Sequence, residues 1–167
     1  MRTGLLLLTI LLAPLTGVAL DFQHRDTVLL TDIDGITAGR LGRAVGINQG
    51  SVFMGAPEQD NEDSRSGATY LYRINNQREL EFVMELVSQG PSPRQYGGAS
   101  VTGGNIAAIG NESGDLIEIY IRNGGSWVLS RLIESPTIDG VTVRGFGQII
   151  DLKGDLLVVG DPTANVG

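Results

Sequence analysis

Short apolar runs separated by turn residues dominate the chain after its first twenty residues, and no long helical pattern appears there. Three runs, at 52–54, 106–109 and 156–159, are continuously apolar, and each follows a dipeptide that favours a tight hairpin turn. These dipeptides are Gln-Gly at 49–50, Gly-Asn at 104–105 and Gly-Asp at 154–155. Because the runs do not alternate with polar residues, we expect their strands to be buried on both faces.

Glycines bracket each of these hairpins at the same spacing. The first and last glycine of each hairpin are 13 positions apart, and the first glycines of successive hairpins are 55 and then 50 positions apart; the pairs are Gly42 and Gly55, Gly97 and Gly110, and Gly147 and Gly160. Self-similarity of this kind predicts a repeat architecture. We expect the last glycine of each pair to hold a positive φ or to allow two sheets to approach closely.

Two further strands are predicted after each of the first two hairpins. They are "GATYLYRI" and "ELEFVMELV" at 67–87, then "LIEIYIRN" and "SWVLSRLI" at 116–133. A unit of about 50 residues would then carry four antiparallel strands, which predicts an all-β fold built from the blades of a β-propeller. The segments "IDGITAGRLG" at 33–42 and "IDGVTVRGFG" at 138–147 extend the self-similarity.

These units resemble FG-GAP repeats, the propeller repeats of integrin α subunits and of many bacterial surface proteins. The resemblance is carried by Phe146-Gly147, by Gly55-Ala56-Pro57 and by "SGATYLY" at 66–72, and it covers about residues 39–162. Leu41 replaces the aromatic residue of the pattern in the first copy, and Gly110-Asn111-Glu112 replaces Gly-Ala-Pro in the second. Calcium-binding members of the family carry an acidic loop between the two glycines. Here a two-residue turn occupies that interval, so the family's calcium ligands are not carried over.

The repeats set the expected domain boundaries. They are a signal peptide at 1–19, a ring-closing N-terminal strand at 20–38, propeller repeats at 39–93 and 94–143, and a partial repeat at 144–167. Because two and a half blades do not close a ring, we expect further copies after Gly167 in the natural protein. Residues 27–31 are expected to pair with strands of those later copies.

The N-terminus and the charge predict the compartment. One Arg, an apolar core from Leu5 to Leu15, and small residues around Ala19 are typical of a secretory signal. Pro14 interrupts the apolar core, which is too short to span a membrane, so we expect no membrane span in the mature chain. The net charge of −7 and the absence of a basic stripe argue against nucleic-acid binding. We therefore expect a secreted, periplasmic or cell-surface protein.

Few residues are candidates for chemistry. Asp60 and Asp63, in the acidic segment 57–67, are weak candidates for a metal site, although a solvated loop explains them more simply. The chain has no Cys, and its one His, His24, lies near the expected mature N-terminus, which is a poor platform for catalysis. Trp127 is expected to pack at the rim and not to bind a ligand, and the strand tyrosines Tyr70, Tyr72 and Tyr120 are expected to have structural roles. We predict no catalytic residue, no resident metal and no cofactor.

Two functions remain open at this point. The resemblance to FG-GAP proteins implies a non-enzymatic interaction module, for adhesion or for binding an extracellular protein or glycan. The alternative is a non-catalytic or substrate-binding part of a larger secreted hydrolase. A fold alone does not decide between them.

Overall fold

The computed structural model describes residues 8–12, 23–28, 39–60, 66–90, 95–111, 116–138 and 140–163. The chain divides into two compact units, Met1–Ile36 and Thr37–Gly167. In the first unit, β1 (Leu8–Leu12) pairs antiparallel with β2 (Gln23–Val28). Strand β1 therefore falls in the segment expected as a signal peptide. Of the residues 27–31 that were expected to pair with later copies, Thr27 and Val28 pair with Thr9 and Leu8 of β1, and 29–31 lie outside the described residues. Pairing with later copies stays a prediction.

The second unit is all-β and antiparallel, and its described residues contain no helix. The first sheet has the order β3-β4-β5-β6, the second has the order β7-β8-β9-β10, and a third hairpin is formed by β13 and β14. The strands are β3 (Ala44–Asn48), β4 (Ser51–Ala56), β5 (Ala68–Ile74), β6 (Leu80–Leu86), β7 (Tyr96–Gly103), β8 (Ile106–Asn111), β9 (Leu116–Asn123), β10 (Ser126–Glu134), β13 (Ile149–Lys153) and β14 (Leu156–Gly160). The four predicted strands of each full unit are thereby confirmed.

A short ribbon precedes the third hairpin. It consists of β11 (Thr137–Ile138) and β12 (Val141–Thr142), paired antiparallel. Residue 139, in the turn between them, lies outside the described residues. The ribbon belongs to the segment 138–147 that the sequence repeats at 33–42. Its counterpart before the first sheet falls on residues 32–37, which are not described.

The predicted hairpin turns are present with the geometry that their residues favour. Gln49 and Gly50 both have positive φ, 47° and 77°, as a type I′ turn requires. In the other two hairpins the glycine comes first: Gly104 has φ 57° and Gly154 has φ 63°, which is typical of type II′. Each turn joins strands in the register that the glycine spacing predicts.

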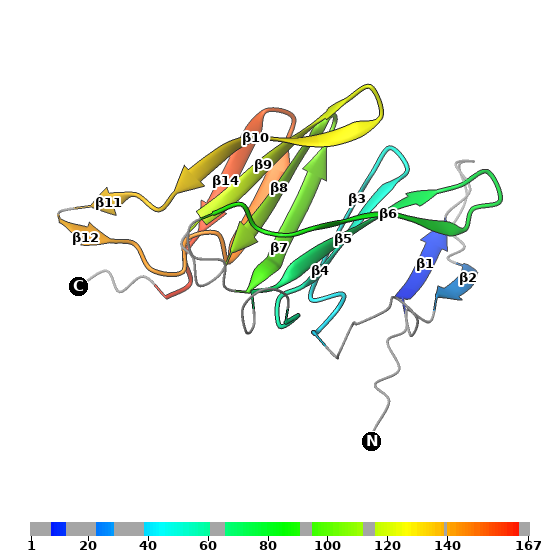
Figure 1. Ribbon diagram of the computed structural model, residues 1–167, viewed down its shortest axis with the longest axis horizontal. Helices are drawn as coiled ribbons and strands as arrows, with labels where there is room; N and C mark the ends of the chain where they lie inside the picture. Colours follow the sequence, from blue (N-terminus) through cyan, green and yellow to red (C-terminus); the bar gives the residue numbers. More distant parts are fainter. Residues whose placement is uncertain are drawn as a thin grey trace, which may run out of the picture. The chain divides into compact units, whose positions relative to one another are not determined.

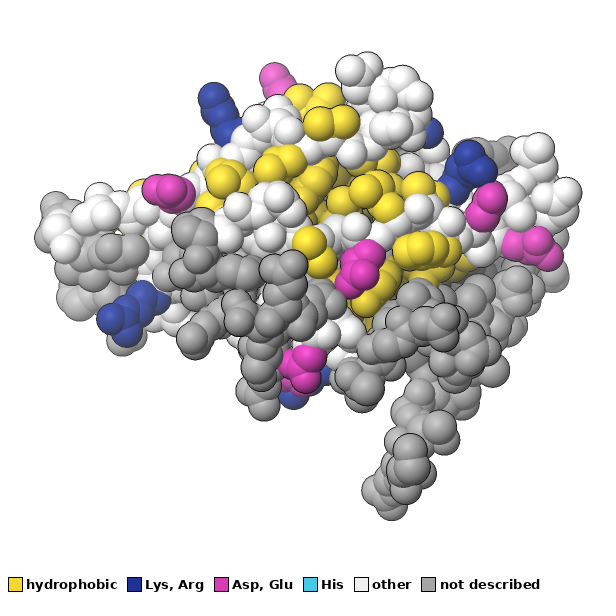
Figure 2. Space-filling view, in the orientation of Figure 1, with side chains coloured by type: hydrophobic (Ala, Val, Ile, Leu, Met, Phe, Trp, Pro, Cys, Tyr) yellow, Lys and Arg dark blue, Asp and Glu magenta, His cyan; other side chains and the backbone are white. Residues whose placement is uncertain are grey.

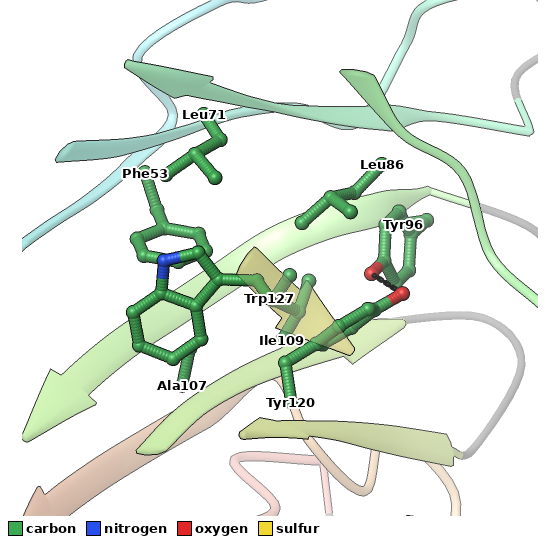
Figure 3. Packing of buried hydrophobic residues seen from close by; sticks show 8 residues of the cluster. All are labelled: Phe53, Leu71, Leu86, Tyr96, Ala107, Ile109, Tyr120 and Trp127. Atoms are coloured by element: carbon green, nitrogen blue, oxygen red, sulfur yellow. Dashed lines mark hydrogen bonds between the residues drawn. The ribbon is translucent and has the colours of Figure 1, made fainter. Parts of the chain in front are cut away.

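Within the second unit, the sheet β3–β6, the sheet β7–β10 and the hairpin β13–β14 are stacked in chain order (Figure 1). Strand β7 contacts β3 and β4 of the first sheet, and β13 contacts β7 and β8 of the second. A cluster of apolar side chains fills the space between the two four-stranded sheets (Figure 3). Within it, the centroids of the Trp127 and Phe53 rings lie 5.0 Å apart and the ring planes make an angle of 85°, which is an edge-to-face contact. Trp127 therefore has a structural role, as expected, but it packs in the interior and not at the rim.

The second strands of the first two hairpins are more deeply buried than the second strand of the third hairpin. Strand β4 is buried along its whole length, and β8 is buried except at its first residue. The prediction of two buried faces is confirmed for these strands. It is wrong for β14, whose residues alternate between exposed and partly buried, because no other described strand covers its second face.

Candidate functional site

Three copies of one tight turn begin the repeats. We call the segments 40–43, 95–98 and 145–148 the repeat turns. In each, the amide of the fourth residue donates to the carbonyl of the first, at 3.0, 3.2 and 3.1 Å. The first and third residues have positive φ in all three copies; they are Arg40 and Gly42, Gln95 and Gly97, Gly145 and Gly147. Glycine at the third position is what a type II turn requires, so turn geometry explains the glycine after each bulky residue.

The carbonyl of each later repeat turn lies against a glycine of the preceding sheet. A Cβ built on Gly55 would lie 1.8 Å from the Gly97 carbonyl oxygen, and one built on Gly110 would lie 2.0 Å from that of Gly147. Neither Gly55 nor Gly110 has a positive φ, so the close approach of two backbones explains these glycines. For Gly160 the expectation of a close backbone approach is wrong among the described residues, because its nearest neighbour is the Ile149 side chain at 3.4 Å.

The strand ends that lead into the longer connections, after β4, β6, β8 and β10, lie at one edge of the sheets, which we call the loop edge. Of these connections the structure describes residues 57–60, 66–67, 87–90, 95, 135–138 and 140–148, and the repeat turns lie at this edge too. The tight turns at 49–50, 104–105, 124–125 and 154–155 lie at the opposite end of the same strands, which we call the turn edge. Longer connections on a rigid scaffold are where binding residues concentrate, so the loop edge is the candidate functional site.

Hydrogen bonds connect the first and third repeat turns to the segments that follow β4 and β14. In the first copy, the Glu58 amide donates to the Gly39 carbonyl at 3.0 Å, and the Glu58 carboxylate pairs with Arg40 at 3.0 Å. In the third copy, the Thr163 hydroxyl donates to the Arg144 carbonyl at 2.8 Å. Glu58 and Thr163 each come three residues after the last glycine of their hairpin, so these contacts are equivalent. The loop edge is therefore built the same way in both copies.

A buried carboxylate ties the first sheet to the second beside the loop edge. Glu118 on β9 is fully buried, and its Oε1 accepts from the Ser88 hydroxyl at 2.8 Å and from the Gln89 amide at 2.6 Å. Its Oε2 accepts from the Tyr120 hydroxyl at 2.7 Å, which in turn accepts from the Tyr96 hydroxyl at 3.1 Å (Figure 3). Three donors satisfy the carboxylate, and buried polar groups are tolerated only when they are paired in this way.

The tyrosines around this carboxylate have raised pKa values. Burial raises the pKa of Tyr96 well above its ordinary value, and the negative Glu118 carboxylate raises it further. Burial also raises the pKa of Tyr120, although the hydrogen bond from Tyr96 opposes part of that shift. Both hydroxyls therefore keep their protons at neutral pH and donate them toward Glu118. The network holds the connection at 88–90 in place.

On the first sheet, the tyrosines that the sequence singled out are packed as well. Tyr70 and Tyr72 on β5 are buried, and burial raises the pKa of Tyr72 to about 12. The Tyr70 hydroxyl lies 3.2 Å from the Glu85 carboxylate, to which it donates. Tyr72 pairs with Val52 as Tyr120 pairs with Ala107, so these two tyrosines occupy matching positions in the two sheets. Structure explains them, as the sequence predicted.

The weak metal candidates are not brought together. Asp60 is exposed at the end of the described segment 39–60, and Asp63 lies outside the described residues. Among the residues that the structure describes, no group of three or more His, Asp or Glu side chains is placed to hold a metal ion. His24 lies on β2. Asn111, in the sequence Asn-Glu-Ser, is fully buried, so its side chain is not accessible in the fold.

Sequence reasoning missed the Glu118 network. The pattern "LIEIYIRN" contains a single carboxylate within an apolar strand, and this is the signal that could have singled it out. Strand alternation places that carboxylate on the same face as Tyr120, two positions later. The donors Ser88 and Gln89 belong to the preceding repeat, and only the tertiary structure brings them to β9.

Comparison with family models, with curated proteins and with solved structures finds no match to the chain. In the described part of the chain, there is no helix with the length and apolar character needed to cross a membrane.

Proposed function

We propose that residues 39–163 form blades of a β-propeller that works as a secreted or cell-surface interaction module, binding an extracellular protein or glycan. One observation carries the proposal: successive repeats meet through the same contact, a glycine of a central strand against the carbonyl of the next repeat turn. The contact occurs between Gly55 and Gly97 and again between Gly110 and Gly147. Repeated four-stranded sheets joined by one kind of interface are what a propeller requires.

The loop edge supports the binding part of the proposal. It lies at the strand ends that lead into the longer connections of both full repeats, and it presents charged groups such as the Arg40–Glu58 pair on a fixed backbone. At the turn edge, by contrast, most connections are two-residue turns that offer little side-chain surface. A rigid stack with its longer connections on one side is an arrangement that binding modules use. The resemblance to FG-GAP repeats points to adhesion.

A binding screen with matched charge variants tests this function. The probes are a printed glycan array and immobilised collagen, fibronectin and laminin. The test variant replaces Arg40 and Glu58, the ion pair at the loop edge, by alanine. The control replaces Arg73 and Glu81, an exposed ion pair at 2.8 Å beside the turn edge, by alanine. Exposed ion pairs contribute about 0–1 kcal/mol to stability, so both variants should fold.

The proposal predicts binding to at least one probe, lost in the loop-edge variant and kept in the turn-edge variant. Equal loss in both variants would contradict the assignment of the loop edge. No binding to any probe by the parent chain would contradict the proposed adhesive function itself.

A further inference from the structure

The turn between β9 and β10 contains the only Asn-Gly dipeptide of the chain, Asn123-Gly124. Asn123 is the last residue of β9 and pairs with Ser126 of β10. Gly124 and Gly125 form the turn between them, with φ 57° and 93°. All four residues are exposed, and backbone and uncharged polar side chains make up most of the surface at the tip of this hairpin (Figure 2). The dipeptide is therefore in contact with solvent.

No hydrogen bond within the described part of the chain holds the side-chain amide of Asn123 or the backbone nitrogen of Gly124. An unbonded side-chain amide can rotate toward the next backbone nitrogen. A Cβ built on Gly124 would meet no atom within 4 Å, so no neighbouring group hinders movement at this position. The nitrogen of a glycine is also the least hindered one that can follow an asparagine, because glycine carries no Cβ.

The other asparagines that the structure describes lack one of these features. Hydrogen bonds hold the Asn48 and Asn75 side chains, and Asn111 is fully buried. Asn76 and Asn105 are exposed in turns, but each is followed by a residue with a side chain. Asn105 is the matched comparison, because it lies in the other hairpin turn of the second sheet, at the same turn edge.

The exposure of the β9–β10 turn does not depend on which repeats are stacked beside it. The corresponding turn of the first sheet joins β5 to β6 at 75–79, and the second sheet is stacked on that first sheet. Residues 76–79 are exposed all the same. A further repeat stacked on the second sheet would leave 123–125 exposed in the same way.

We propose that Asn123 is a site of spontaneous deamidation. The Gly124 nitrogen bonds to the Asn123 Cγ and the Cγ–Nδ2 bond breaks, which closes a cyclic imide; the proton of the Gly124 amide leaves with Nδ2 as ammonia. Solvent water then opens the imide at either carbonyl, which gives aspartate or isoaspartate. The reaction needs no oxidant and no reactant other than water. This inference rests on the β9–β10 hairpin and is independent of the proposed binding function.

Asn123 must leave its strand conformation for the imide ring to close. Its pair with Ser126 is the last of the β9–β10 ladder, and terminal pairs open at a small free-energy cost. The two turn glycines ease this opening because they tolerate many backbone conformations. The reaction therefore proceeds from the folded protein, through local opening of the hairpin.

Deamidation alters the start of β10. Either product adds a negative charge, and isoaspartate also adds a carbon atom to the main chain of the hairpin. The next pair of the ladder joins Trp127 to Arg122, and Trp127 packs against Phe53 between the two sheets. We therefore expect isoaspartate to loosen the packing of Trp127 and to shift its fluorescence emission to longer wavelength.

Peptide mapping by mass spectrometry, after storage of the full chain at pH 8, tests the site. The mass identifies replacement of the NH₂ group by OH, and chromatography separates aspartate from isoaspartate. We expect conversion at Asn123 to be about tenfold or more faster than at Asn105, because the Ile106 that follows Asn105 carries a branched Cβ and glycine carries none. The rate should rise with pH, since the attacking nitrogen must lose its proton. No conversion at Asn123, or equal conversion at both positions, would overturn the proposal.

The same storage in concentrated urea measures how far the hairpin protects the site. We expect the folded and unfolded rates to differ by less than about a hundredfold, and a larger difference would overturn reaction from the folded hairpin. Asn123→Gln, stored in the same way, should keep its emission while that of the parent chain shifts, and Asn123→Asp should show the effect of the charge alone. An equal shift in the parent chain and in Asn123→Gln would contradict the link to Trp127.

Discussion

Gly110 is the position where one added methyl group tests the packing between repeats most sharply. A Cβ there would lie 2.0 Å from the Gly147 carbonyl oxygen, so the two backbones must separate by about 1.4 Å to reach the 3.4 Å of ordinary contact. The Gly147 backbone cannot shift alone, because its turn is closed by the hydrogen bond from the Gln148 amide to the Gly145 carbonyl. Gly110→Ala should therefore cost about 1–3 kcal/mol of unfolding free energy, the range for overpacked interiors.

The chain offers an internal control for this variant. Gly160 has the same place in its hairpin, but a Cβ on it would lie 3.4 Å from the Ile149 Cβ, an ordinary contact. Gly160→Ala should therefore change the stability by less than about 0.5 kcal/mol. A bulkier Gly110→Val substitution should destabilise more than Gly110→Ala, because it brings more atoms to the same contact.

Urea denaturation followed by tryptophan fluorescence measures the difference. Trp127 is the only tryptophan and is buried against Phe53, so its emission reports on the space between the two sheets. At a typical slope of about 2 kcal/mol per molar urea, a loss of 2 kcal/mol lowers the midpoint by about 1 M. If Gly110→Ala and Gly160→Ala had the same midpoint, the close approach at Gly110 would be refuted.

Three further predictions concern the buried network and the metal. Glu118→Gln should lower the unfolding free energy by about 1–3 kcal/mol in the same urea assay, because an amide oxygen and an NH₂ group cannot accept from three donors; an unchanged midpoint would contradict the network. Because the pKa values of Tyr96 and Tyr120 are raised in the folded chain, their stabilising contribution is complete below pH 10 and is lost as the pH rises above it. The urea midpoint should fall above pH 10, and less steeply in Tyr96→Phe; equal slopes would argue against the shift. Titration calorimetry with calcium chloride should give no binding of micromolar affinity or tighter, whereas a stoichiometric signal would show that the chain holds a calcium site elsewhere.

The strands and turns could be predicted because their signals are local. Gln49-Gly50 and Gly154-Asp155 specify tight turns by backbone conformation alone, and the apolar runs beside them specify strands. The constant spacing of the glycines also singled out Gly55 and Gly110 as positions of a positive φ or of a close approach between sheets, and the structure shows the close approach. These features depend on positions within one repeat, which the sequence contains in full.

Other features depend on what lies opposite in space. The runs 106–109 and 156–159 look alike in sequence, yet β8 is covered on both faces and β14 on one, since burial depends on a neighbouring sheet and not on the strand itself. The Glu118 network needs Ser88 and Gln89 from the preceding repeat, and no pattern within one repeat predicts that these residues contact Glu118. The binding function that we propose depends on the loop edge, and its ligand is not specified by any pattern within the repeats.

The contact between repeats is the central claim, and nuclear Overhauser effects between glycine α-protons test it most directly. A Cβ on Gly97 would lie 3.1 Å from the Gly55 Cα, and one on Gly147 would lie 3.6 Å from the Gly110 Cα, so protons in those places are close to the preceding sheet. The account predicts cross-peaks between the α-protons of Gly55 and Gly97, and between those of Gly110 and Gly147. Assigned spectra in which both cross-peaks are absent, while the hairpins of β4 and β8 are intact, would contradict the stacking of the repeats.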